Sequence, residues 1–182
     1  GVLTELHLRL RAQPAMDATY LARGGRQALA GAGQSVVESQ VGLVALELLA
    51  PAIAAVPEWT LAARLGGTVD GVHAEAARLE AVTGLTWEQL PVERAAAFWS
   101  LVARAPLSGE VALRLGGLLD GLPDLTDLVI EMLGEGLLAA GLGTGALRWA
   151  GDAEAEALKA LRHRAAEREV PLTLERAPWP IR

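Results

Sequence analysis

Apolar and polar residues alternate in several short stretches of the chain, and a period of two predicts β-strands. In residues 59–65, for example, Leu61 and Leu65 fall on one face and Arg64 falls on the other. Residues 137–142 and 146–149 flank a glycine-rich turn and predict a hairpin. The predicted strands span residues 2–11, 18–23, 41–49, 59–65, 109–115, 137–142, 146–149 and 171–176.

Helical spacing of apolar residues appears between these strands. The clearest helix begins after Thr68, a plausible N-cap, and ends before Gly84, where a C-terminal glycine is expected. Asp152 is predicted to cap the last long helix. The other predicted helices span residues 26–38, 92–104 and a segment that starts near Pro123.

The order of these elements predicts an α+β fold. Pairs of strands separated by helices are typical of an antiparallel sheet with helices on one face. Each β-α-β-β-α-β stretch resembles a ferredoxin-like unit. We therefore expect a duplicated ferredoxin-like architecture, with about seven strands in a single sheet.

Three strand ends resemble one another and support an internal repeat. They read LAARLGG, VALRLGG and GALRWAG, and they carry Arg64, Arg114 and Arg148. Each arginine points away from the large apolar residues beside it, so all three are expected on the face without helices. They are candidate substrate-binding residues, because a guanidinium matches a carboxylate in shape and charge. The alternative is that they are outward positions exposed to solvent.

Composition narrows the class of function. The formal net charge is −6, without a run of Lys and Arg, which argues against nucleic-acid binding. The chain has no cysteine and three histidines without a metal-binding spacing. No stretch is long and apolar enough for a transmembrane segment, and no secretion signal is visible. The expected location is cytoplasmic.

The opening GVLTELHLRLRAQP resembles the end of the flavin domain in FAD-linked oxidases of the vanillyl-alcohol-oxidase type. Later segments resemble, in order, the C-terminal part of the E subunit of bacterial glycolate oxidase. They are ALELLAP, WTLAARLGG, FWSLVAR, GALRWAGD with the helix after it, and PLTLERAP.

This resemblance implies a flavoprotein that oxidises a 2-hydroxy acid such as glycolate. Residues 1–14 would be the tail of a FAD-binding domain, and residues 15–182 the substrate or cap domain that covers the flavin. The implied partners are the FAD-binding domain and the related flavoprotein and iron–sulfur subunits of glycolate oxidase. The glycine-rich loop that binds pyrophosphate is absent from the chain. FAD is therefore expected only in the intact protein, and the chain alone is expected to be inactive.

Candidates for the chemistry are few. His7, on the polar face of the first predicted strand, is the obvious base, although a lone strand histidine is more often incidental. Glu47 interrupts an apolar strand, so it is either paired in the sheet or points to its open face. Two other functions stay possible: a non-catalytic ferredoxin-like module for ligand sensing or assembly, and a structural subunit that supports a related flavoprotein.

Overall fold

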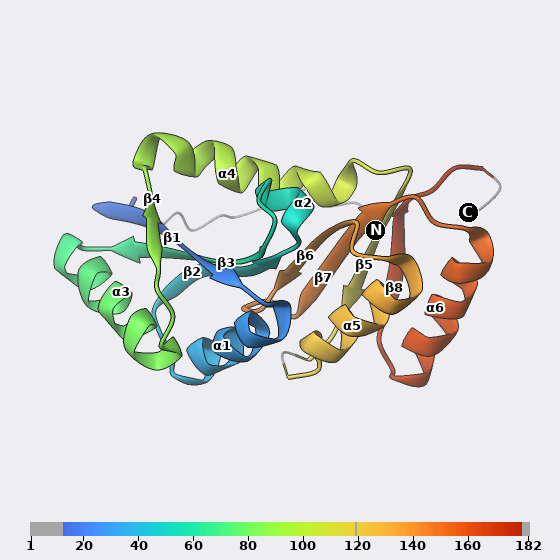
Figure 1. Cartoon of the computed structure of the whole chain (residues 1–182), viewed down its shortest axis with the longest axis horizontal. Coiled ribbons are helices and arrows are strands. Elements are labelled where there is room, and N and C mark those ends of the chain that lie inside the picture. Colours follow the sequence, from blue (N-terminus) through green and yellow to red (C-terminus); the bar gives the residue numbers. More distant parts are fainter. Residues whose placement is uncertain (1–12, 119, 180–182) are drawn as a thin grey trace, which may run out of the picture.

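The computed structural model describes residues 13–118 and 120–179, and these residues form one eight-stranded antiparallel sheet (Figure 1). The predicted strand at residues 2–11, including His7, lies outside the described residues. The strand order is β4-β1-β3-β2-β6-β7-β5-β8. None of the described helices is long and apolar enough to cross a membrane.

The first half of the sheet is one β-α-β-β-α-β unit with the strand order β4-β1-β3-β2. A short helix and the long helix α4 are added to this pattern. The elements of this half are β1 (Met16–Gly24), α1 (Arg26–Glu38), β2 (Leu43–Leu49), α2 (Pro51–Ala54), β3 (Trp59–Gly67), α3 (Val69–Thr83), β4 (Glu88–Leu90) and α4 (Val92–Arg104).

The second half repeats the unit in the order β8-β5-β7-β6, and the two units join where β2 pairs with β6. The duplicated ferredoxin-like prediction is therefore confirmed. The elements of this half are η1 (Ala105–Leu107), β5 (Val111–Gly116), α5 (Leu122–Leu133), β6 (Leu137–Gly141), β7 (Ala146–Gly151), α6 (Ala155–Glu167) and β8 (Leu172–Arg176).

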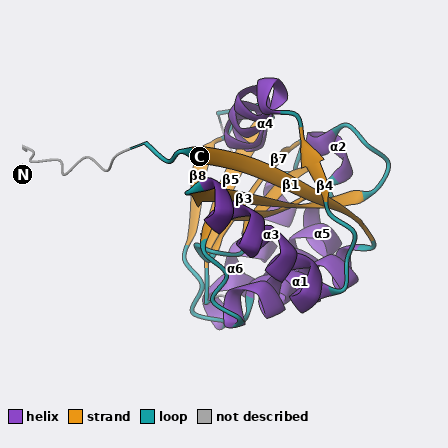
Figure 2. Ribbon diagram, turned by 90° about the vertical axis from the view of Figure 1, so that its left-hand side faces the viewer, coloured by secondary structure: helices purple, strands orange, loops and turns teal. Residues whose placement is uncertain are grey.

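One face of the sheet, here called the four-helix face, is covered by α1, α3, α5 and α6 (Figure 2). Large side chains from the central strands point into this layer, and Leu61, Leu113 and Trp149 are almost fully buried there. Burial of apolar surface in this layer is the main source of stability. This is the face on which the sequence predicted all the helices.

The opposite face, here called the α4 face, is partly covered by α4 and α2 (Figures 1 and 2). This corrects the prediction that helices cover one face alone. Apolar positions of α4 at helical spacing pack over small and apolar strand residues, among them Leu49 and Ala62, which are fully buried. Trp99 also donates a hydrogen bond of 2.8 Å from its indole N–H to the hydroxyl of Thr19. The helix lies here because the middle of this face is too apolar to be left in water.

Local signals were mostly accurate, with two exceptions. Thr68 caps α3 by accepting a hydrogen bond from the Gly71 amide, and Gly84 ends that helix in a left-handed conformation, as predicted. Asp152 is not the cap of α6: the N-cap is Glu154, two residues later, and it makes no side-chain cap bond. The strand β4 was not predicted, because three residues carry no measurable alternation.

Candidate functional site

The strand register places the three repeat arginines on the α4 face. Arg148 pairs with Ala139, Ala139 with Leu49, and Leu49 with Thr60. Arg64 is four residues beyond Thr60 on the same strand, so its side chain leaves the sheet on the same side. Arg114 lies directly opposite Arg148 in the β5–β7 pair. Their shared face agrees with the sequence pattern, and their role in substrate binding stays a prediction.

Arg64 is already occupied by a carboxylate of its own unit. Its Nε donates to Asp17 Oδ1 at 2.9 Å and to Oδ2 at 3.2 Å, and its NH2 also donates to Asp17. This bidentate pair holds the pKa of Asp17 below its ordinary value and raises the pKa of Arg64. Arg64 is therefore held in a closed ion pair, which leaves its guanidinium a poor candidate for binding a ligand.

Arg114 is also paired, although more loosely. Its Nε lies 3.3 Å from Glu175 Oε1, and about half of the Arg114 side chain is exposed. The pair lies toward the β8 edge of the sheet, where solvent screens its charges. This arrangement is typical of an exposed ion pair.

Arg148 differs from the other two. Its Nε is buried and has no hydrogen-bond partner among the described residues. Across the narrow strand β6 it faces Glu47, and the positive charge of Arg148 acts on that carboxyl group. A buried donor without a partner costs free energy, so Arg148 is a candidate to donate a hydrogen bond to a ligand.

Arg148 and Glu47 line a cavity of about 240 Å³ on the α4 face, here called the Glu47–Arg148 cavity. Small residues of the sheet form its floor, α4 forms one wall, and the β6–β7 turn closes one end. The lining residues are Ala45, Glu47, Trp99, Val102, Ala103, Ala139, Thr144, Ala146 and Arg148.

Gly141 keeps room for the polar groups of this cavity. A Cβ at this position would lie 3.1 Å from Glu47 Oε1 and would collide with the Thr144 hydroxyl. Thr144 donates to the Gly141 carbonyl at 3.2 Å, so its oxygen can still accept a hydrogen bond. The hairpin turn therefore brings a hydroxyl to the carboxyl of Glu47 and the guanidinium of Arg148.

Burial raises the pKa of Glu47 to about 7, and the attraction of Arg148 limits this rise. A carboxyl group that titrates near neutrality can either donate or accept a proton under physiological conditions. Together with a cation, it forms a site that can bind a small anion and exchange a proton with it. The sequence analysis singled out Glu47 and Arg148 separately. It did not predict that they share a cavity, because this depends on the pairing of β2 with β6.

The histidines contribute nothing to this cavity in the described part of the chain. His73 and His163 are both exposed, on α3 and α6. His7, the predicted base, lies outside the described residues.

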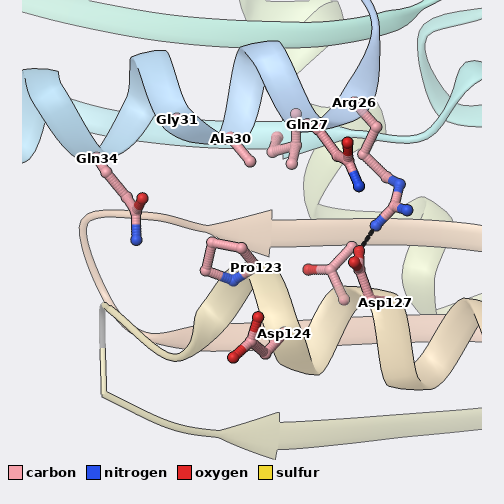
Figure 3. Close-up of a pocket in the computed structure, with 10 residues that line it drawn as sticks. Arg26, Gln27, Ala30, Gly31, Gln34, Pro123, Asp124 and Asp127 are labelled. Atoms are coloured by element: carbon pink, nitrogen blue, oxygen red, sulfur yellow. Dashed lines mark ion pairs between the residues drawn. The ribbon is translucent and has the colours of Figure 1, made fainter.

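A second cavity of about 220 Å³ lies on the four-helix face, between α1 and α5 (Figure 3). Arg26 of α1 forms an ion pair with Asp127 of α5 and stacks over Trp59, with its guanidinium carbon 5.8 Å from the ring centroid. Asp124 is exposed in the first turn of α5, a position that favours a carboxylate. Arg26 and Asp127 have each other as structural partners, so we interpret this cavity as part of the contact between the two units.

No family model matches the chain, and no curated protein matches it in sequence. A solved structure of alkyldihydroxyacetonephosphate synthase is similar in fold, with a TM-score of 0.53 and 12% sequence identity. The match covers 88% of this chain and 40% of the synthase chain, so the chain spans less than half of that protein. At this level of identity the similarity shows a shared fold alone, and it does not single out the E subunit of glycolate oxidase.

Proposed function

We propose that the chain is the substrate domain of a FAD-dependent 2-hydroxy-acid oxidoreductase of the glycolate oxidase type. The observation that carries the proposal is Arg148, which lines a cavity on the α4 face and whose buried Nε has no hydrogen-bond partner among the described residues. The fold similarity to alkyldihydroxyacetonephosphate synthase and the sequence resemblance to the E subunit support the same class.

In this proposal Arg148 holds the carboxylate of the substrate, since a guanidinium gives charge and direction to that contact. Glu47 faces Arg148 in the same cavity and is the nearest group that can exchange a proton. Arg64 and Arg114, which have acidic partners, would shape the field around the site but would not bind substrate. A short hydroxy acid fits the volume of about 240 Å³.

The Glu47–Arg148 cavity is too small to hold the flavin itself. The cavity is smaller than the pockets of roughly 300–1,000 Å³ that hold drug-sized ligands, and a dinucleotide needs more room. FAD would be held by the FAD-binding domain implied by the sequence resemblance, with residues 15–182 as its cap. The related flavoprotein and iron–sulfur subunits, and a cytoplasmic location, belong to the same proposal. FAD supplies the acceptor for hydride in such chemistry.

The test is glycolate-dependent reduction of a dye by the chain together with its FAD-binding domain. We expect Arg148→Gln to raise KM for glycolate by about 10- to 100-fold, the range for loss of a charged hydrogen bond. Arg164→Gln, on the exposed side of α6, is the matched control and should leave KM unchanged. Retained flavin without glycolate-dependent reduction would contradict the proposal.

A ligand-sensing module is the second candidate, and one observation favours it. The Glu47–Arg148 cavity is built entirely from residues of this chain, so it can bind a small anion without a flavin domain. Binding of glycolate with the same affinity in the presence and absence of the FAD-binding domain, and without dye reduction, would favour the module.

A further inference from the structure

The Glu47–Arg148 cavity is lined by an acidic residue and a cationic residue that come from different units. Glu47 belongs to β2 and Arg148 to β7, and β6 lies between these strands. Neighbouring strands are about 4.8 Å apart, and the register offsets the two residues by two positions along the strands, so their Cα atoms are separated by roughly 12 Å, which two long side chains can bridge. Only small residues of β6, Ala139 and Gly141, lie on this face between them. The two charged heads therefore share one space above β6.

We propose that this cavity binds a short monocarboxylate, which Arg148 holds by its charge while Glu47 meets it as a protonated hydrogen-bond donor. The choice of a carboxylate among small anions rests on the proposed function. The coupling of anion and proton rests on the cavity alone.

The physical reason is competition for one guanidinium. An ionised Glu47 neutralises Arg148 and repels a second carboxylate that enters the same cavity. A protonated Glu47 removes that repulsion, and its O–H can donate to the ligand. Binding of one anion therefore takes up as much as one proton, and by linkage the affinity falls as the pH rises.

Arg148 is the charged neighbour of Glu47 among the described residues that line the cavity. Arg64 lies diagonally opposite Glu47 on β3, and its guanidinium is bound to Asp17. The wall from α4 consists of Trp99, Val102 and Ala103, and none of these is ionisable. The hairpin turn contributes Thr144, whose hydroxyl donates to the Gly141 carbonyl and can accept a hydrogen bond from the acid. Burial already raises the pKa of Glu47 to about 7, so the switch between the two forms falls near neutral pH.

The test is a titration of the 182-residue chain with acetate, glycolate and the neutral analogue acetamide, followed by amide NMR shifts and calorimetry between pH 5.5 and 8.5. In the wild-type protein we expect both carboxylates to bind, with an affinity that falls by up to about tenfold per pH unit above pH 7. Acetamide should bind at least about tenfold more weakly than acetate at pH 6, because it lacks the charge.

Variants separate the two roles. Glu47→Gln should bind acetate with an affinity that no longer depends on pH, because glutamine keeps a donor and loses the titration. Arg148→Gln should weaken acetate binding by about tenfold or more at every pH, and Arg148→Lys should recover part of it. Glu156→Gln and Arg164→Gln remove the same charges from the exposed side of α6 and should change neither affinity nor pH dependence.

Several results would overturn the inference: no carboxylate binding, equal binding of acetate and acetamide, or an unchanged pH dependence in Glu47→Gln. Proton-linked acetate binding without glycolate oxidation in the presence of the FAD-binding domain would remove the proposed function alone. Glycolate oxidation, together with a carboxylate affinity that is the same in Glu47→Gln and wild type at every pH, would contradict this inference alone.

Discussion

The two ferredoxin-like units place an arginine at the corresponding point of their third strands and use it differently. In the first unit, Arg64 meets Asp17 of the adjacent strand in a bidentate pair. The register puts Ala112 at the corresponding place in the second unit, so Arg148 has no acid on its own adjacent strand. The same position is therefore neutralised in one unit and left to other partners in the other.

A second difference strengthens the first. The residue directly opposite Arg148 is Arg114, a like charge, whereas Thr19 lies opposite Arg64. The charge of Arg148 acts instead on Glu47 of the first unit. Glu47 lies on β2, the strand that joins the first unit to the second. The comparison teaches that a duplicated fold can form a candidate site where the copies meet, when one copy lacks the ion pair that the other has.

The largest expected effect is on stability, from Glu47→Gln. The folded-state pKa of Glu47, about 7, is above its ordinary value of 4.5. The folded protein therefore binds the proton more tightly, and its stability falls as the pH rises from about 4.5 to 7. Glutamine removes this penalty, so the variant should be more stable above pH 7 by up to about 3 kcal/mol. Urea unfolding at pH 5 and pH 8 measures the change.

The matched control for this prediction is Glu156→Gln on α6, where the carboxylate is exposed and bound to Lys159. It should shift stability by less than about 0.5 kcal/mol at either pH. Equal stability of Glu47→Gln and wild type at pH 8 would show that the Glu47 carboxylate is not penalised by burial.

An intermediate effect is expected on the titration of Glu47 itself. Arg148 lowers the pKa of this carboxyl group against the effect of burial. Arg148→Gln should therefore raise the pKa of Glu47 above 7, by about one unit or more, as observed when an opposite charge nearby is lost. Carbon-detected NMR of the glutamate carboxyl groups follows this titration.

Arg64→Gln is the control that tests the comparison between the units. Arg64 is bound to Asp17, so its removal should leave the titration of Glu47 almost unchanged and alter that of Asp17 instead. Similar shifts of Glu47 in both variants would mean that the two arginines act on the cavity alike, although Arg64 is paired with Asp17.

Much of the fold could be predicted from the sequence because its signals are local. Alternation identified most of the strands, and Thr68 and Gly84 marked both ends of α3. The position of α4 could not be predicted in this way. The spacing of its apolar residues, from Ala95 to Val102, is visible in the sequence, but the face of the sheet that they cover depends on long-range packing.

The candidate site was predicted in part, for a related reason. Alternation within a strand places Arg64, Arg114 and Arg148 on one face, and this needs no knowledge of the partners. Which of them finds a counter-charge depends on register between strands. Asp17 lies 47 residues from Arg64, and Glu47 reaches Arg148 only through β6. The repeat motif also grouped Arg114 with the other two, although it lies on the first strand of its unit and not the third.

The smallest expected effect comes from Asp17→Asn, which makes the first unit resemble the second. The Asp17–Arg64 pair is about one-third exposed, so its loss should cost less than about 1 kcal/mol at pH 7. Because the pKa of Asp17 is lowered, the pair stabilises the protein above pH 3.8, and this contribution is lost as the pH falls through the lowered pKa. The variant and the wild type should therefore converge in urea unfolding near pH 2. We also expect the variant to bind no second acetate in calorimetry, because Arg64 does not line the Glu47–Arg148 cavity beside α4. Two acetates per chain would show that an unpaired arginine on this face is sufficient, and that neither the cavity nor Glu47 makes the site.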